Sequence, residues 1–439
     1  MRKVVRRDAL KALGAAALAA SGGMTLRQRN AAAAETRYPL EKDAQLKVLR
    51  WKRFVQGDED VWMANTRIFT EQTGVPVQVE SVNGEELRPK GAMAASVGAG
   101  PDIVMGAPDM PQLYPDKCVD LTDVAGYLGQ KYGGWYDVCQ RYCMVDGRWI
   151  ALSMAVVTFC VVYRESMVKA AGFSEIPRDL AGFLKLFQAL KARGTPGGLT
   201  LGNALGDITW CSWLLWSHGA SLVDENNRVT INSKETIAAL EYGRELFTTF
   251  IPGTLSWLDP SNNKAFLAGQ ISLTWNPISI YYVAKTSSDP ALNAMAADIQ
   301  HAHLPIGPVG RPTELHGALS AFVFKYTKYP NAAREYLRFM LEREQYETWQ
   351  QASLGFMCQT LRAYESNPIW TSDPKITPFR DGPRLTLYSG YRGTIGTASA
   401  AATAEAIIPQ MVAEAVSGQS TPKDAAARAE QRARRYYKT

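Results

Sequence analysis

The sequence predicts an α/β protein built in two lobes. Strand-like and helix-like segments alternate along the chain, which is typical of a parallel sheet covered by helices. About 405 residues follow an N-terminal leader-like segment, and this length exceeds what one hydrophobic core usually serves. The composition, 46% hydrophobic and 21% charged, is ordinary for a globular chain.

The first half predicts a run of βαβ units. Strand, helix, strand, helix and strand follow one another over residues 46–51, 61–72, 75–79, 85–97 and 101–105. A polar loop over 56–60 follows the first strand, and a proline-rich loop over 107–111 follows the third.

The second half begins with a nearly continuous strand over 150–163, which suits a crossover between lobes. Helices are predicted over 179–193, 210–217, 234–250 and 262–268, followed by strands over 271–275 and 317–324. One long helix is predicted over 331–351, and two more over 398–416 and 422–437.

Residues 1–34 predict an export signal. A basic start containing Arg6-Arg7 precedes a short apolar run over 12–20, which is too short to span a membrane. Small residues before Glu35 supply a cleavage site near Ala34, so the mature protein is expected in the periplasm. The paired arginines favour the twin-arginine route, and an ordinary secretory signal is the alternative.

The net charge of +6 belongs to this leader. Residues 1–34 hold seven Lys or Arg and one acid, which leaves 41 basic and 41 acidic residues in the rest of the chain. A neutral mature chain gives no support for a nucleic-acid partner.

The sequence predicts no metal and no cofactor. It holds four histidines, and it contains no Walker loop, GxSxG, HExxH or CxxC motif. Cys139 and Cys143 stand one helical turn apart without a second ligand pair, so they are expected to be structural thiols or part of a disulfide.

The aromatic residues point to a ligand with apolar faces and hydroxyl groups. Eleven Trp and nineteen Tyr are present, and Trp210, Trp213 and Trp216 fall within seven residues. Trp275-Asn276 stands where a strand breaks into a loop, the place where α/β units bind ligands. Indoles with nearby amides suit a sugar, and the alternative is that these rings belong to the core.

Five motifs in order resemble the family 1 extracellular solute-binding proteins, the carbohydrate receptors of ABC importers. Each motif alone is weak, and the resemblance spans nearly the whole mature chain. The motifs are a helix, Thr-Gly turn and strand over 66–77, Gly-Ala-Gly-Pro-Asp over 98–102, and segments over 265–273, 317–324 and 330–339.

The resemblance implies the type II periplasmic-binding-protein fold, with a ligand cleft between two discontinuous lobes joined by crossover strands. The expected boundaries are 35–156 plus 317–362 for one lobe and 157–316 plus 363–439 for the other. The crossovers are expected near 155–157 and 316–317.

The resemblance also assigns ligand-binding positions. Val157 and Gly106 depart from the acid and the Trp that some relatives carry, which argues against a maltodextrin. Arg392 would allow an acidic sugar, and Asp109 an amino sugar. The candidate ligand-binding residues are Gln56, Asp58, Asp109, Trp210, Trp213, Trp275, Asn276, Tyr391 and Arg392.

The expected function is a monomeric, non-catalytic receptor that delivers a sugar, polyol or sugar derivative to ABC permease subunits. One alternative keeps the fold and changes the ligand to a polyamine or a peptide. Another is a secreted carbohydrate-active enzyme that uses two carboxylates.

Overall fold

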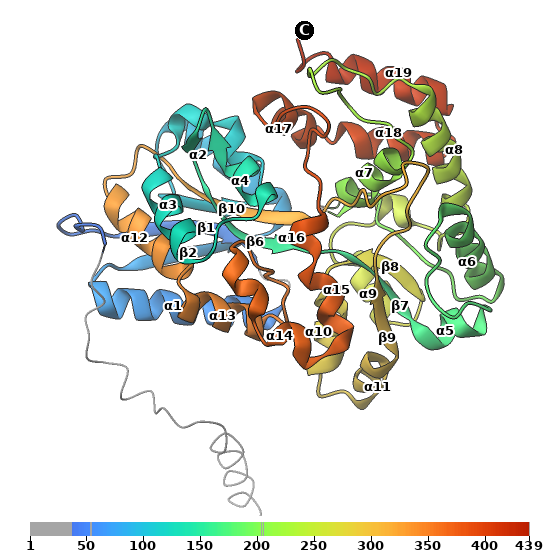
Figure 1. Cartoon of the computed structure of the whole chain (residues 1–439), viewed down its shortest axis with the longest axis horizontal. Helices are drawn as coiled ribbons and strands as arrows, with labels where there is room; N and C mark the ends of the chain where they lie inside the picture. The colour runs from blue at the N-terminus through green and yellow to red at the C-terminus, as the bar shows by residue number, and fades with distance from the viewer. Residues whose placement is uncertain (1–36, 53–54, 203, 205, 439) are drawn as a thin grey trace, which may run out of the picture.

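The chain folds into two lobes, each built around its own β-sheet, which confirms the predicted α/β class (Figure 1). The computed structural model describes residues 37–52, 55–202, 204 and 206–438. The predicted export signal over 1–34 lies outside the described residues.

The first sheet has five strands and is mixed. β1 pairs in parallel with β2 and β3, whereas β10 runs antiparallel to β3 and β6. In spatial order the strands are β2 (Val77–Val82), β1 (Leu46–Trp51), β3 (Ile103–Gly106), β10 (Gly317–Val323) and β6 (Leu152–Val157).

The second sheet has three antiparallel strands, and β7 is its centre. The strand predicted over 150–163 is two strands, because Thr158 and Phe159 carry the chain from β6 in the first sheet to β7 in the second. The strands are β8 (Leu273–Asn276), β7 (Cys160–Arg164) and β9 (Ile299–Ala302), with a separate hairpin of β4 (Met144–Val145) and β5 (Arg148–Trp149).

Helices lie on both sides of the first sheet. In Figure 1, α1 and α13 lie together below it, whereas α2 and α4 lie above it. The helices of this lobe are α1 (Gln56–Thr73), α2 (Gly84–Val97), α3 (Thr122–Lys131), α4 (Asp137–Cys143), α12 (Pro330–Met340) and α13 (Arg343–Ala352).

The second lobe has a helical layer in which α7, α8, α18 and α19 pack against one another. Its helices are α5 (Glu165–Ala170), α6 (Leu180–Ala192), α7 (Asp207–Ser217), α8 (Lys234–Phe247), α9 (Ser261–Leu267), α10 (Ser279–Thr286), α11 (Pro290–Asp298), α18 (Ile407–Val416) and α19 (Pro422–Ala433).

Short helices connect the lobes late in the chain. Figure 1 shows α15 and α16 running between the two lobes, with α17 beyond them. These elements are α14 (Ile369–Ser372), α15 (Thr377–Arg380), α16 (Gly382–Leu385) and α17 (Thr397–Ala404). The 3-10 turns are η2 (Met110–Leu113), η3 (Pro115–Lys117), η4 (Thr254–Ser256), η5 (Arg362–Ser366) and η6 (Pro374–Ile376).

Two predicted helices are each broken in two. The helix predicted over 331–351 divides into α12 and α13, because the backbone at Glu342 is extended (φ −68°, ψ 151°). The Glu342 carboxylate accepts a hydrogen bond of 2.8 Å from Lys131, which ties this break to α3. The helix predicted over 398–416 divides at Ala406, whose φ of 53° is left-handed. Hydrophobic periodicity continues across both breaks and therefore does not reveal them.

The loop predicted over 56–60 is the first turn of α1. Both oxygens of Asp58 lie 2.7 Å from Nη2 of Arg50 on β1, and one of them accepts a hydrogen bond of 2.8 Å from Nε1 of Trp349 on α13. Asp58 is buried, so this ion pair joins three elements of the first lobe.

All six cysteines are buried free thiols, which resolves the open choice at Cys139 and Cys143 in favour of structural thiols. Burial raises the pKa of the Cys139 thiol to about 12, so it stays protonated at neutral pH. Within the described ranges, the helices are all too short or too polar to cross a membrane.

Replacing Asp58 with alanine is expected to lower the free energy of unfolding by about 3 kcal/mol, because it leaves the buried Arg50 guanidinium without its counter-ion. Denaturant unfolding measures this loss. Asp60→Ala is the matched control, because Asp60 is exposed two residues later and accepts a hydrogen bond from the exposed Gln56. Equal losses in the two variants would contradict the role given to the ion pair.

Candidate functional site

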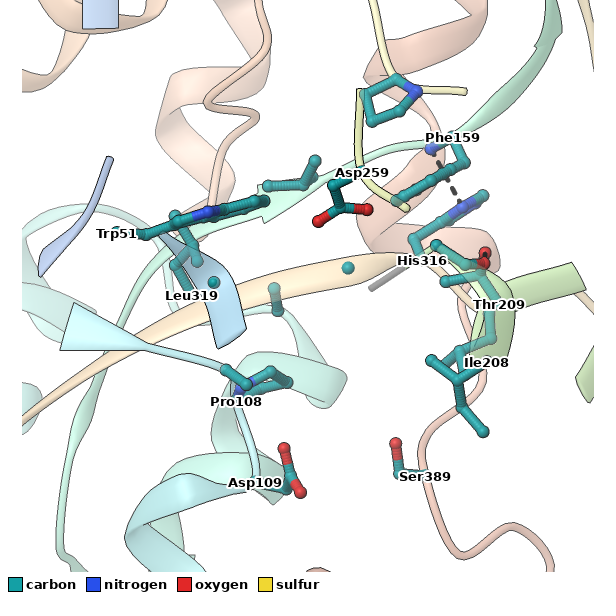
Figure 2. Close-up of a pocket in the computed structure, with 18 of the residues that line it drawn as sticks. Trp51, Pro108, Asp109, Phe159, Ile208, Thr209, Asp259, His316, Leu319 and Ser389 are labelled. Carbon is teal, nitrogen blue, oxygen red and sulfur yellow. Dashed lines mark hydrogen bonds between the residues drawn. The ribbon is translucent and has the colours of Figure 1, made fainter. Parts of the chain in front are cut away.

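A cleft of about 1150 Å³, its open mouth included, lies between the lobes. The crossover residues Val157, Phe159, His316 and Gly317 line it together with both lobes. Other lining residues are Trp51, Leu87, Arg88, Pro108, Asp109 and Leu319 from the first lobe and Ile208, Thr209, Asp259, Asn262, Trp275 and Asn276 from the second (Figure 2).

Three stacked rings form one part of this cleft. The Trp275 ring packs nearly parallel to the rings of Phe159 and His316, at centroid distances of 5.8 and 6.0 Å and interplanar angles of 27° and 24°. Its Nε1 donates a hydrogen bond of 2.9 Å to the Thr209 hydroxyl on α7. The indole predicted at this strand end is therefore held in a fixed orientation at the cleft.

Trp51 brings a second indole from the opposite lobe. It ends β1, and Figure 2 shows its ring beside Leu319, with the carboxylate of Asp259 directed into the same cavity. The sequence predicted the end of this strand, but Trp51 was not among the predicted site residues. The signal was present, because an indole at the carboxyl end of a parallel strand is the same pattern that selected Trp275.

Asp109 lies in the cleft, as predicted, but its charge is balanced. It follows β3, and its two carboxylate oxygens accept hydrogen bonds of 2.7 and 2.9 Å from Nη2 of Arg88 on α2. The Asp109 side chain is 3% exposed and that of Arg88 is 26% exposed. The pair therefore presents part of a guanidinium to the cleft and no isolated carboxylate.

Asn276 lines the cleft, and its amide is engaged within the second lobe. Its Oδ1 accepts a hydrogen bond of 3.0 Å from Asn262, and its Nδ2 donates to the Pro277 carbonyl and the Ser279 hydroxyl, both at 2.9 Å. These contacts fix the turn that follows β8. Asn276 thus positions Trp275 while retaining contact with the cavity.

Four predicted site residues do not line the cleft. Gln56 is exposed and Asp58 belongs to the core ion pair. Trp210 and Trp213 are buried, and their Nε1 atoms donate to the carbonyls of Thr200 and Pro305 at 2.7 and 2.9 Å. The reason is that α7 is buried around nearly its whole circumference, so its indoles anchor the helix in the second lobe.

Tyr391 and Arg392 also lie apart from the cleft. The Tyr391 ring packs edge-on against Trp216 at 5.3 Å, and its hydroxyl accepts a hydrogen bond from Arg311. The Arg392 guanidinium is partly exposed and lies 3.8 Å from the carboxylate of Glu225.

A buried carboxylate supports the cleft at His316. Glu314 lies 3.2 Å from Nδ1 of His303 and 3.3 Å from Nε2 of His316, and it accepts a hydrogen bond of 2.6 Å from the Leu304 amide. Burial would raise the pKa of Glu314, but the two histidines outweigh it and lower this pKa to about 2. The hydrogen bond to Glu314 outweighs burial at His303 and raises the pKa of that imidazole.

His316 also holds the backbone of the crossover. Its Nδ1 accepts a hydrogen bond of 3.3 Å from the Phe159 amide, drawn as the dashed line in Figure 2. Since Nδ1 is the acceptor, it carries no proton in this hydrogen bond.

The described residues contain no cluster of three or more His, Cys, Asp or Glu side chains that would hold a metal ion. His301 is buried, and its Nδ1 bonds the Lys375 carbonyl at 2.7 Å. Burial lowers its pKa to about 4.

The comparison with protein families identifies the class of this protein. Residues 66–378 match the family described as bacterial extracellular solute-binding protein. The chain belongs to this family and is a solute-binding protein of an ABC transporter.

Individual relatives agree with this assignment. A probable ABC transporter-binding protein of Deinococcus radiodurans is 26% identical over 291 residues, which cover 64% of this chain and 67% of the relative. The fold matches T. maritima MalE3, solved with maltose bound, at a TM-score of 0.77 and 18% identity, covering 89% of this chain and 99% of that one. It also matches a sugar transporter of Arthrobacter chlorophenolicus A6, solved with laminaribiose bound, at a TM-score of 0.77 and 15% identity. This match covers 89% of this chain and 99% of that one.

Replacing Glu314 with glutamine is expected to remove part of the acid sensitivity of the fold. The pKa of Glu314 is lowered on folding, so its contribution to stability is present above about pH 4.5 and is lost as the pH falls toward 2. Denaturant unfolding between pH 5 and 2.5 is therefore expected to show a shallower decline in Glu314→Gln than in the unchanged protein.

The exposed Glu175 provides the control for this titration. Glu175→Gln is expected to follow the unchanged protein through the same pH range. If Glu314→Gln also follows it, the ionised Glu314 carboxylate does not stabilise the fold.

Proposed function

We propose that the cleft binds a carbohydrate or a related polyhydroxylated solute, which the protein delivers to the membrane subunits of an ABC importer. The observation that carries this proposal is the fixed Trp275 ring at the cleft, with Trp51 on the opposite lobe. A sugar presents apolar C–H faces that pack on such rings and hydroxyl groups that need hydrogen-bonding partners.

Polar groups suited to hydroxyls line the same cleft. The Arg88 guanidinium offers N–H donors to the cleft, and Asn262 and Asp259 add polar side chains to its lining. The sugars named for the two solved relatives, maltose and laminaribiose, support this ligand class. Closure of the lobes around the solute would bring both walls into contact with it.

The charge balance favours a carbohydrate over a polyamine. A polyamine site needs several carboxylates, and the acids among the described lining residues are Asp109 and Asp259. Asp109 is already paired with Arg88 through both of its oxygens. The partly exposed Arg88 guanidinium would repel an ammonium group.

We further propose that the protein catalyses no reaction on the bound solute. A glycosidase needs one carboxylic acid able to donate a proton and a second carboxylate. Both carboxylate oxygens of Asp109 are engaged by Nη2 of Arg88, at 2.7 and 2.9 Å, so this carboxyl group is held by the protein and is not directed at a glycosidic bond.

The proposed site of action is the periplasm. Residues 1–34 would direct export and be removed near Ala34, by the twin-arginine or the general route. The protein would act as a monomer, with the lobe boundaries at 156–157, 316–317 and 362–363, and would meet the permease in its ligand-bound form.

The test measures ligand binding by the purified protein through its thermal unfolding. The protein is unfolded in the presence of neutral sugars, polyols, sugar acids, amino sugars or polyamines. A ligand at 100 times its Kd adds about 2.7 kcal/mol to the folded state, which raises Tm by roughly 2–4 °C. A shift with carbohydrates and no turnover supports the proposal. A shift with polyamines alone, or release of product, contradicts it.

Trp51→Leu is expected to weaken carbohydrate binding by about tenfold or more, because a well-packed Trp contact contributes at least ~1.4 kcal/mol. Titration calorimetry measures the Kd. Trp257→Leu is the matched control, because Trp257 is likewise partly buried and does not line the cleft. Equal affinities in the two variants would show that the Trp51 ring does not bind the sugar.

A further inference from the structure

A continuous part of the cleft lining is apolar. Leu319 and Ala318 come from β10, Val157 ends β6, and Leu87 lies on α2. Pro108, which follows β3, extends the same surface. These five residues are the apolar wall of the cleft, and all of them belong to strands or helices of the first lobe or to the loop after β3.

The second lobe places an apolar side chain across from this wall. Ile208, in the first turn of α7, lines the cleft and is partly exposed, as is Pro108. Figure 2 shows Pro108 and Ile208 on facing sides of the cavity, with Leu319 beside the ring of Trp51. An apolar group held between the lobes would therefore contact both of them.

Several polar side chains of the lining are already engaged within the protein. Both oxygens of Asp109 are bonded to Arg88. The Thr209 hydroxyl accepts a hydrogen bond from Trp275, and the Asn276 amide has partners at both its oxygen and its nitrogen. A sugar ring carries hydroxyl groups around its rim, and each one loses binding free energy if it is buried without a partner. A ligand that is hydroxylated on every side therefore suits this lining poorly.

The polar side chains suited to a sugar are separated from the apolar wall. Asp259 and Asn262 line the cleft from the second lobe, where the Trp275 ring offers a surface for packing. Figure 2 shows Asp259 and Pro108 on different sides of the cavity. A sugar unit beside Asp259 would leave the apolar wall in contact with water, and covering that wall with an apolar group is favourable.

We propose that the solute is a glycoside with an apolar aglycone. Its sugar unit lies beside Trp275 and Asp259, and its aglycone packs between the apolar wall and Ile208. The proposal rests on the proposed carbohydrate function and specifies the chemical class of the second part of the ligand.

The experiment compares paired methyl and phenyl glycosides of glucose, galactose, mannose and xylose, in both anomeric forms, by titration calorimetry on the intact protein. Free sugars, polyols and phenol are measured beside them. At least one phenyl glycoside is expected to bind at least ten times more tightly than its methyl partner, because the phenyl group covers apolar surface that a methyl group leaves in contact with water. Phenol alone is expected to bind at least ten times more weakly than that glycoside.

Two variants test where the phenyl group lies. Leu319→Asn nearly keeps the shape of the side chain and places an amide on the apolar wall, so the ratio of phenyl-glycoside to methyl-glycoside affinity is expected to fall about tenfold. Ile208→Thr is a milder change at a partly exposed position and is expected to lower the same ratio about threefold. The second variant keeps the test decisive if the variant at the buried Leu319 does not fold.

Ile68→Thr is the matched control, because Ile68 is likewise a partly buried isoleucine on a helix and does not line the cleft. It is expected to keep the affinity ratio of the unchanged protein. An equal fall of the ratio in Ile68→Thr would contradict the proposed contacts, as would an unchanged ratio in both Leu319→Asn and Ile208→Thr.

The ligand panel separates this proposal from the carbohydrate function. If free sugars, polyols or methyl glycosides bind and every phenyl glycoside gains less than tenfold over its methyl partner, the apolar aglycone is wrong and the carbohydrate function stands. Phenol binding as tightly as every glycoside would overturn both proposals, and so would binding of no sugar, polyol or glycoside.

Discussion

The antiparallel pairing of β10 with β6 is the constraint on which the site depends. It sets Gly317 opposite Val157. The chain leaves the first sheet at Val157, the end of β6, and returns to it at Gly317, the start of β10. A Cβ atom on Gly317 would lie 3.3 Å from Val157 Cβ, so a larger residue would strain this pairing. Because both crossovers meet here, Phe159 and His316 come together beside the cleft.

The side chains that define the cleft stand at the ends of strands. Trp51 ends β1, Asp109 follows β3, and Trp275 stands one residue before the end of β8. The sheets fix the positions of these strand ends, and neighbouring groups fix the side chains, as Thr209 fixes Trp275 and Arg88 fixes Asp109. A site built in this way is rigid within each lobe, so movement of one lobe against the other can change access to it.

Charged side chains at and beneath the cleft are paired with other groups of the protein. The Arg50–Asp58 pair is buried in the core, and the Arg88–Asp109 pair is buried except for part of its guanidinium. Glu314 lies between two histidines under the crossover. With the strongest charges already paired, aromatic surface and neutral hydrogen-bonding groups dominate the recognition that this cleft can provide.

The sequence by itself determined the class of fold and the strand-end part of the site. Alternating periodicity predicted the βαβ order, and Trp275 and Asn276 could be selected because strand ends are visible in local sequence, whereas Asp109 was selected through the family resemblance. Only the tertiary structure decided which side of each element is buried. Asp58 is buried in the core, where it accepts a hydrogen bond from Trp349, 291 positions away in the sequence. Trp210 and Trp213 are buried because other helices pack around α7. Local periodicity specifies the type of an element, whereas contacts distant in sequence specify which of its faces meets the ligand.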